Sequence, residues 1–205
     1  MENKENQIER RTITLKELRI IDELPTSNAE PVIEGYASVF DSWSEELGGE
    51  FPFRERVVKG AFEESIQRDD IRALFNHDPN YVLGRNTSNT LSLEEDEKGL
   101  RVRITPPQTQ WAKDLLVSIK RGDITQMSFG FTVILDRWSY EDNIDIRELL
   151  KVKLYDVSPV TFPAYSQTEC GIRTIFERHK EAQKSKDKNK RNLEIKKQKL
   201  KFMED

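Results

Sequence analysis

Three side chains in this sequence could together carry out acyl transfer: His77, Ser128 and Asp156. A serine hydroxyl becomes an effective nucleophile when an imidazole takes its proton, and a carboxylate on the other ring nitrogen fixes the tautomer of that imidazole. The chain has one other histidine, His179, which lies in a charged run. The order of the three residues along the chain matches none of the best-known orders of such triads, so it argues neither way.

Ser128 lies in the middle of an expected strand over residues 126–135. Alternate residues of a strand share a face, so Met127 and Phe129 take one face while Ser128 and Gly130 take the other. A glycine in mid-strand often marks a close approach of backbone or ligand, which is consistent with a nucleophile beside a substrate strand. Taken alone, the position fits an ordinary sheet serine better.

His77 ends the apolar run 73–75 and is followed by Asp78-Pro79, a pair typical of turns. A histidine at the end of a core strand could present its imidazole at the rim of a cleft. The alternative is a half-buried histidine that is hydrogen-bonded to the turn.

Asp156 continues an apolar stripe of the expected strand 146–157 by the period of two. A carboxylate at such a position must be paired or hydrogen-bonded, because burying it alone is costly. An imidazole N–H would be a natural partner. The alternative is that the strand ends at Tyr155 and that Asp156 caps the Ser158-Pro159 turn.

The elements that must position these residues are mostly short β-like runs separated by turn residues. They cover residues 12–20, 32–40, 51–58, 71–77, 89–94, 100–105, 126–135 and 146–157. Two helices are expected over 59–68 and 109–121, the second with Thr109 as N-cap and Gly122 at its C-terminal end. The pattern predicts a mainly β (α+β) fold: a closed β-barrel of about seven to eight short, mostly antiparallel strands flanked by a few helices, because closure removes exposed edges.

Composition excludes several classes of protein. Of 205 residues, 36% are hydrophobic and 34% charged, which indicates a core diluted by solvated segments. No apolar run approaches the roughly 18 residues of a membrane span, and the N-terminus has no apolar stretch typical of a secretory signal. A single cysteine, Cys170, allows neither an intrachain disulfide nor a cysteine-based zinc site. We therefore expect a cytoplasmic-type protein with no metal or other cofactor.

The charge is unevenly spread. The chain has a net charge of −4, yet residues 177–205 hold eleven Lys/Arg against six Asp/Glu. We expect a disordered N-terminus over 1–11, a folded domain over 12–176, and a basic tail over 177–205 that is helical or disordered. Nucleic-acid binding by the tail is not expected, because it lacks interleaved aromatics and its acids oppose phosphate contacts.

Six segments between about residues 30 and 175 resemble, in order, the prohead serine proteases of tailed bacteriophages, which are relatives of the herpesvirus assemblins. They are Glu34-Gly35-Tyr36-Ala37 with Val39-Phe40, Val58-Lys59-Gly60-Ala61-Phe62, Leu74-Phe75-Asn76-His77-Asp78, Val82-Leu83-Gly84-Arg85, Met127-Ser128-Phe129-Gly130-Phe131, and Asp156-Val157-Ser158-Pro159-Val160-Thr161-Phe162-Pro163-Ala164-Tyr165. Any one segment is a weak signal. Six in the right order are a strong one.

The resemblance implies His77 as general base and Ser128 as nucleophile. Assemblins use a second histidine as the third member, whereas this family often has an acidic residue in the segment of Asp156. We expect Asp156 there, with Glu148 and Asp78 as alternatives, and backbone N–H groups around Ala164 and Tyr165 as candidate oxyanion donors. The family fold is a closed β-barrel flanked by helices.

The function that the resemblance implies is a serine endopeptidase of phage prohead maturation. Such a protease would act in the host cytoplasm, inside the immature capsid, on the scaffold protein or the scaffolding domain of the major capsid protein, and on itself. The tail would then be a removable segment that recruits the protease to its substrates, or a solvated tail with no partner. A homo-oligomer is compatible with the sequence. The alternative function is a non-catalytic capsid-assembly or scaffold-binding barrel.

Overall fold

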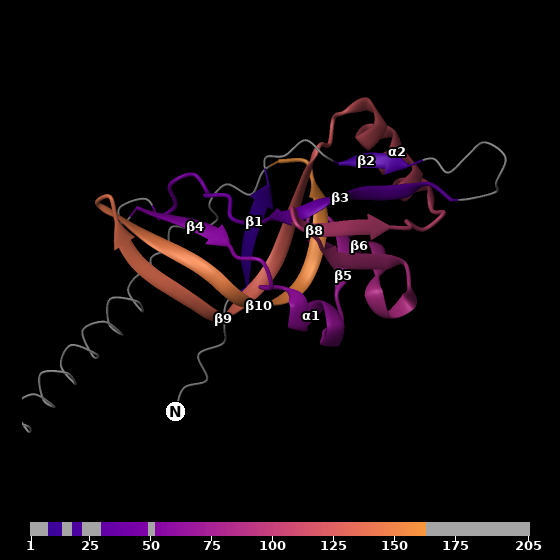
Figure 1. Ribbon diagram of the computed structural model, residues 1–205. Coiled ribbons are helices and arrows are strands. Elements are labelled where there is room, and N and C mark those ends of the chain that lie inside the picture. Colours follow the sequence, from indigo (N-terminus) through magenta and orange to yellow (C-terminus); the bar gives the residue numbers. More distant parts are fainter. Residues whose placement is uncertain (1–7, 14–17, 22–29, 49–51, 163–205) are drawn as a thin grey trace, which may run out of the picture.

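The computed structural model describes residues 8–13, 18–21, 30–48 and 52–162 (Figure 1). The basic tail over 177–205, together with Ala164 and Tyr165, lies outside these residues. The described elements are β1 (Glu9–Ile13), β2 (Arg19–Ile21), β3 (Val32–Val39), β4 (Phe53–Val57), α1 (Glu63–Arg68), β5 (Arg72–Phe75), β6 (Asp78–Arg85), the short 3-10 helix η1 (Asn86–Ser88), β7 (Leu91–Glu95), β8 (Gly99–Ile104), α2 (Gln110–Arg121), β9 (Gln126–Glu141) and β10 (Ile144–Val160).

The strands form two sheets. The larger has the order β1-β9-β10-β5-β6, with β4 also paired to β10, and the smaller has the order β2-β3-β8-β7. Neighbouring strands are antiparallel except where β10 runs parallel to β4 and β5. The predicted mainly β, mostly antiparallel fold is confirmed.

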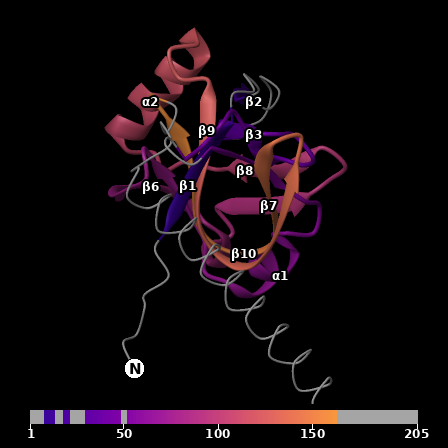
Figure 2. The same cartoon turned by 90° about the vertical axis from the view of Figure 1, so that its left-hand side faces the viewer.

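The predicted closed barrel is wrong: within the described residues both sheets are open. Alternation in the sequence shows that strands exist, but it does not show which strands pair. Here β9 and β10 are 16 and 17 residues long, far longer than the runs expected from the sequence, and they form one strongly curved hairpin (Figure 2). The larger sheet is organised along this hairpin and ends at β1 and β6.

One hydrophobic core joins the two sheets and α2. Ile33 and Leu100 of the smaller sheet belong to the same buried cluster as Phe129 and Val157 of the larger sheet. Phe62, just before α1, meets Phe129 edge-on with ring centroids 5.4 Å apart. Each such fully buried side chain contributes about 1.5–3 kcal/mol, so this core fixes the strands that carry the candidate site.

The N-terminal segment differs from the prediction. Glu9–Arg11, expected within a disordered segment, belong to β1, which pairs with β9. The expected strand over 12–20 is divided, because β1 ends at Ile13 and β2 pairs with β3 in the other sheet. The segment looked solvated because it is polar, but its charges are matched by ion pairs with buried groups of the fold.

Strand β6 was absent from the prediction because most of its side chains are exposed and do not alternate. Helix α1 begins later than expected, since residues 59–62 form a turn in which the Glu95 carboxylate accepts hydrogen bonds from the N–H groups of Gly60 and Phe62. Helix α2 ends as predicted at Gly122, which has a φ of 81°. Thr109 precedes it without a side-chain cap bond. Neither α1 nor α2 has the length and apolar character needed to cross a membrane.

Candidate active site

Ser128 lies on β9 between two neighbouring strands. It is opposite Ser158 on β10 and opposite Thr12 on β1. With a strand on either side, Ser128 has no exposed surface. Its hydroxyl is therefore reachable only from the two strands and from whatever lies over its face of the sheet.

His77 reaches that face from the tip of the β5–β6 hairpin. Asn76 and His77 form the two-residue turn, with φ values of 54° and 58°, where the sequence predicted a turn at Asp78-Pro79. Positive φ at both positions is the geometry of a type I′ turn, and Asn and His are among the non-glycine residues that adopt positive φ most readily. The backbone conformation of His77 thus sets the direction of its imidazole.

Asn76 fixes this turn to the end of β10. Its backbone N–H donates to the carbonyl of Pro159 at 3.0 Å, and its side-chain oxygen accepts from the N–H of Thr161 at 2.9 Å. These bonds tie the hairpin tip to the strand that carries Asp156.

Asp156 reaches the same face through a β-bulge. Leu154 is opposite Phe131, but the next pair is Asp156 with Gly130, so Tyr155 is an extra residue on β10. Because Phe131 and Gly130 point to opposite faces of β9, Leu154 and Asp156 do as well. The premise that Asp156 continues the apolar stripe of Leu154 is therefore wrong. The bulge turns the carboxylate onto the face of the serine.

Gly130 provides the space for this carboxylate. A Cβ atom at position 130 would lie 2.3 Å from Asp156 Oδ2 and 3.3 Å from its Cγ. The sequence indicated a close approach at this glycine, and the approaching group is the carboxylate of the neighbouring strand.

The three side chains form a continuous hydrogen-bonded series. His77 Nδ1 lies 2.6 Å from Asp156 Oδ1, and His77 Nε2 lies 2.7 Å from Ser128 Oγ. Since a carboxylate only accepts, Nδ1 carries the hydrogen and Nε2 of the neutral ring is the acceptor that faces the serine. Ser158 Oγ donates a second bond to Asp156 Oδ1 at 2.7 Å, which holds the carboxylate in place. The arrangement can take a proton from Ser128 and stabilise the resulting imidazolium.

The two alternative acids lie elsewhere. Asp78 accepts from the backbone and side chain of Asn80. Glu148 is held between Arg137 and Arg56, and the hydrogen bonds from these two arginines, in that order of effect, lower the pKa of its carboxyl. Among the described residues, no group of three or more histidine, cysteine or acidic side chains is placed to hold a metal ion.

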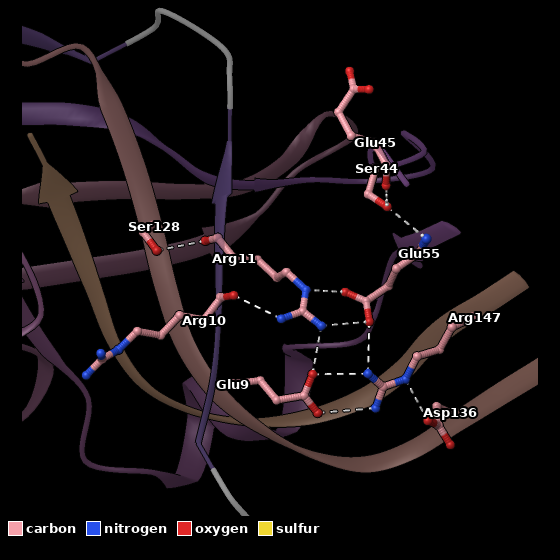
Figure 3. A network of polar contacts seen from close by, with 9 residues as sticks. All are labelled: Glu9, Arg10, Arg11, Ser44, Glu45, Glu55, Ser128, Asp136 and Arg147. Atoms are coloured by element: carbon pink, nitrogen blue, oxygen red, sulfur yellow. Dashed lines mark hydrogen bonds and ion pairs between the residues drawn. The ribbon is translucent and has the colours of Figure 1, made fainter. Parts of the chain in front are cut away.

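The structure adds contacts that the sequence analysis missed. The backbone carbonyl of Arg11 lies 2.9 Å from Ser128 Oγ, so the single hydroxyl hydrogen of Ser128 can be donated either to this oxygen or to His77 Nε2. The side chain of Arg11 enters a buried group of charges that includes Glu55 and Arg147 (Figure 3). One signal was available: Glu55 shares the buried face of β4 with Phe53 and Val57, as period two predicts. The same reasoning that singled out Asp156 would have marked Glu55 as a paired carboxylate.

A mainly β chain whose sheet holds a serine, a histidine and a carboxylate in hydrogen-bonded series has the geometry found in serine peptidases. Residues 16–185 match the family model described as caudovirus prohead serine protease. The chain belongs to this family of phage prohead proteases.

The structure comparison supports the fold. The bacteriophage T4 capsid assembly protease aligns with a TM-score of 0.51 at 14% identity, covering 77% of this chain and 98% of that one. Among curated proteins, no sequence matches significantly.

Proposed function

We propose that the chain is a serine endopeptidase in which Ser128 is the nucleophile, His77 the general base and Asp156 the residue that orients the imidazole. The observation that carries the proposal is the position of His77, whose two ring nitrogens lie 2.6 and 2.7 Å from Asp156 and Ser128. These residues come from three separate segments, and no ordinary packing requirement calls for this series.

The reaction follows from the atoms present. Ser128 Oγ attacks the carbonyl carbon of the scissile peptide bond while its proton passes to His77 Nε2. The C–N bond then breaks as His77 returns that proton to the leaving amine, which leaves an acyl group on Oγ. Water attacks the ester carbon and gives a proton to Nε2; the C–Oγ bond breaks, the acid product leaves, and Ser128 is protonated again. Asp156 stabilises the imidazolium in both halves without taking up a proton.

The biological setting that we propose is prohead maturation inside the immature capsid, in the host cytoplasm. The substrates would be the scaffold protein or the scaffolding domain of the major capsid protein, and the protease itself. The family supports the setting. The contact between Ser128 and the Arg11 carbonyl supports self-cleavage, because it places a backbone carbonyl of the chain at its own nucleophile. A removable tail is an expectation from the resemblance, a homo-oligomer is compatible with the sequence, and backbone N–H groups near Ala164 and Tyr165 are the candidate oxyanion donors.

The test is co-expression of the full chain with the major capsid and scaffold proteins, followed by intact-mass measurement of every product. Wild type should give defined fragments. Ser128→Ala should give none, because removing the nucleophile leaves at most a rate roughly 10³–10⁴-fold above water. Ser139→Ala is the matched control, since Ser139 lies on the same strand but donates to Glu141. Uncut products with both wild type and Ser128→Ala, with co-assembly preserved, would instead identify a non-catalytic assembly module.

A further inference from the structure

Strand β1 lies where an extended substrate would lie. It pairs antiparallel with β9 at the edge of the larger sheet, with Thr12 opposite Ser128. The Arg11 carbonyl oxygen lies 2.9 Å from Ser128 Oγ, which brings this carbonyl within hydrogen-bond distance of the proposed nucleophile. A peptide that adds to a sheet edge uses the same backbone groups as β1 does, so β1 reports the register of such a peptide. In that register Arg11 occupies the position immediately before the scissile bond.

The side chain of Arg11 shows what this position recognises. Its Nε donates to Glu55 Oε1 at 2.7 Å and its Nη2 to Glu55 Oε2 at 3.1 Å, a two-pronged pairing that suits a guanidinium (Figure 3). The guanidinium carbon also lies 5.6 Å from the centroid of the buried Phe131 ring. Glu55 is only 3% exposed. The guanidinium of Arg11 thus has a buried acid at its end and an aromatic ring beside it.

The charges around Glu55 favour a cation even without β1. Arg147 donates to Glu55 Oε2 at 3.0 Å and to Asp136 at 2.8 Å. These three residues together carry one excess negative charge. Burial alone would raise the pKa of Glu55, but the charges of Arg11 and Arg147 outweigh it and lower the pKa. A buried carboxylate must be paired. A neutral residue at the position of Arg11 would leave Glu55 Oε1 without the hydrogen bond that Arg11 donates to it.

We propose that Glu55 forms the base of a subsite that selects arginine or lysine immediately before the scissile bond. The proposal rests on the proposed function of Ser128 as nucleophile. Strand β1 is then an internal occupant of the substrate position, and Arg11 fills the subsite until a substrate strand replaces it.

The structure also indicates which residue the substrate should carry two positions before the basic residue, where β1 has Glu9. Glu9 shares a face of β1 with Arg11, and its Oε2 accepts from Arg147 at 3.0 Å and from Arg11 at 2.8 Å. A peptide in the same register would therefore gain from an acidic residue at the position of Glu9. The preferred substrate segment reads acidic, any residue, basic, and then the cleaved bond.

The probes that test this are peptidyl diphenyl phosphonates with the sequence of residues 8–10 followed by a variable phosphonate residue. Ser128 Oγ forms a bond to phosphorus and one P–O bond to phenoxide breaks, while the serine proton passes through His77 to the departing phenol. The variable residue carries an arginine, a norleucine or a glutamate side chain. The rate of labelling of the full-length protein is measured by intact mass.

The arginine probe should label Ser128 about 10- to 100-fold faster than the norleucine probe, and the glutamate probe should be slowest. Glu55→Gln should remove this ratio, so that the arginine and norleucine probes label Ser128 at similar rates. Glu148→Gln is the matched control, because Glu148 is also a buried acid between two arginines but does not contact β1. It should keep the wild-type ratio. Replacing glutamate by glutamine in the probe, at the position of Glu9, should slow labelling with no change to the protein.

Arg11→Ala should accelerate labelling by the arginine probe, because it removes the side chain that competes for Glu55. Equal rates for the arginine and norleucine probes, in wild type and in Arg11→Ala, would overturn the subsite while leaving Ser128 as the nucleophile. Failure of every probe to label Ser128 in both proteins would overturn the proposed function itself. The wild-type comparison needs no substitution, so a Glu55→Gln protein that fails to fold does not remove the test.

Discussion

Replacing Gly130 with alanine should disable the candidate site while leaving the protein folded. The new Cβ would lie 2.3 Å from Asp156 Oδ2, where ordinary contact begins near 3.4 Å. The carboxylate must therefore move by about 1 Å. The other carboxylate oxygen, Oδ1, lies 2.6 Å from His77 Nδ1, and a shift of about 1 Å away from the ring would lengthen this bond to about 3.6 Å, beyond hydrogen-bond range.

The expected losses are unequal. A misplacement of about 1 Å in a catalytic arrangement costs on the order of 10²-fold in rate. The fold should lose no more than about 1–3 kcal/mol, the usual range for overpacking, because the atom displaced is the end of a side chain. An alanine in mid-strand recovers about 0.5–1 kcal/mol of this in backbone entropy. Activity should fall steeply while the free energy of unfolding changes little.

The assay pairs the rate at which a neutral phosphonate labels Ser128 with the midpoint of urea unfolding. Gly122→Ala is the control with the opposite pattern: Gly122 has a φ of 81° and open space around it, so alanine there strains the backbone at the end of α2 without a steric clash. It should lower stability and leave labelling unchanged. Adding Gly130→Ala to Asp156→Asn should cost little more than Asp156→Asn alone, because both remove the same interaction. Wild-type labelling by Gly130→Ala would refute the role given to the carboxylate.

Three further results are expected. Asp156→Asn should fold normally and label Ser128 roughly 10⁴-fold more slowly, since an amide favours the wrong imidazole tautomer; equal rates would remove Asp156 from the site. Asn76→Gly keeps a residue that tolerates positive φ but loses the hydrogen bond that the Thr161 N–H donates to the Asn76 side chain. The labelling rate of Ser128 should therefore fall while the unfolding midpoint changes little. A lower midpoint with an unchanged labelling rate would contradict a positioning role for Asn76. The lowered pKa of Glu55 stabilises the fold above pH about 4.5 and this contribution is lost as the pH falls further. Glu55→Gln should therefore flatten the acid side of the stability curve measured by urea unfolding, and an unchanged slope would show that Glu55 does not titrate in this way.

The sequence predicted the residue types of the site better than the reasons for their positions. Ser128 and Gly130 share a face as period two requires. Asp156 joins them only because Tyr155 is a bulge residue, and bulges leave little trace in an alternating pattern. His77 reaches them through positive φ values at a turn that the sequence placed two residues later. The pattern could bring the three residues into consideration, but only pairing between strands could bring their atoms together.

The fold shows the same division between local and long-range information. Helix α2 ends at Gly122 as predicted, because glycine readily adopts the left-handed conformation that ends a helix. This prediction depends only on one residue and the helix before it. The pairing of β1 with β9 depends on residues more than a hundred positions apart, and on the ion pair between Arg11 and Glu55. A polar segment is predicted to be exposed to solvent when the oppositely charged residues that pair with it lie far away in the sequence. For this reason the sequence placed the start of this strand at Thr12 and left Glu9–Arg11 in the segment expected to be disordered.

The position of Ser128 has a consequence for selectivity. Since β1 already pairs with β9, a substrate strand must displace it and then makes backbone bonds of the same kind. The backbone hydrogen bonds that β1 gives up are therefore nearly replaced by those of the substrate strand, and the side chains decide which strand binds. Arg11 with Glu55 and Glu9 with Arg147 are the side-chain pairs that hold β1 beside the serine. A peptide displaces β1 only if its side chains interact with Glu55 and Arg147 at least as favourably as Arg11 and Glu9 do. The charges that retain the internal strand therefore also determine which substrates bind.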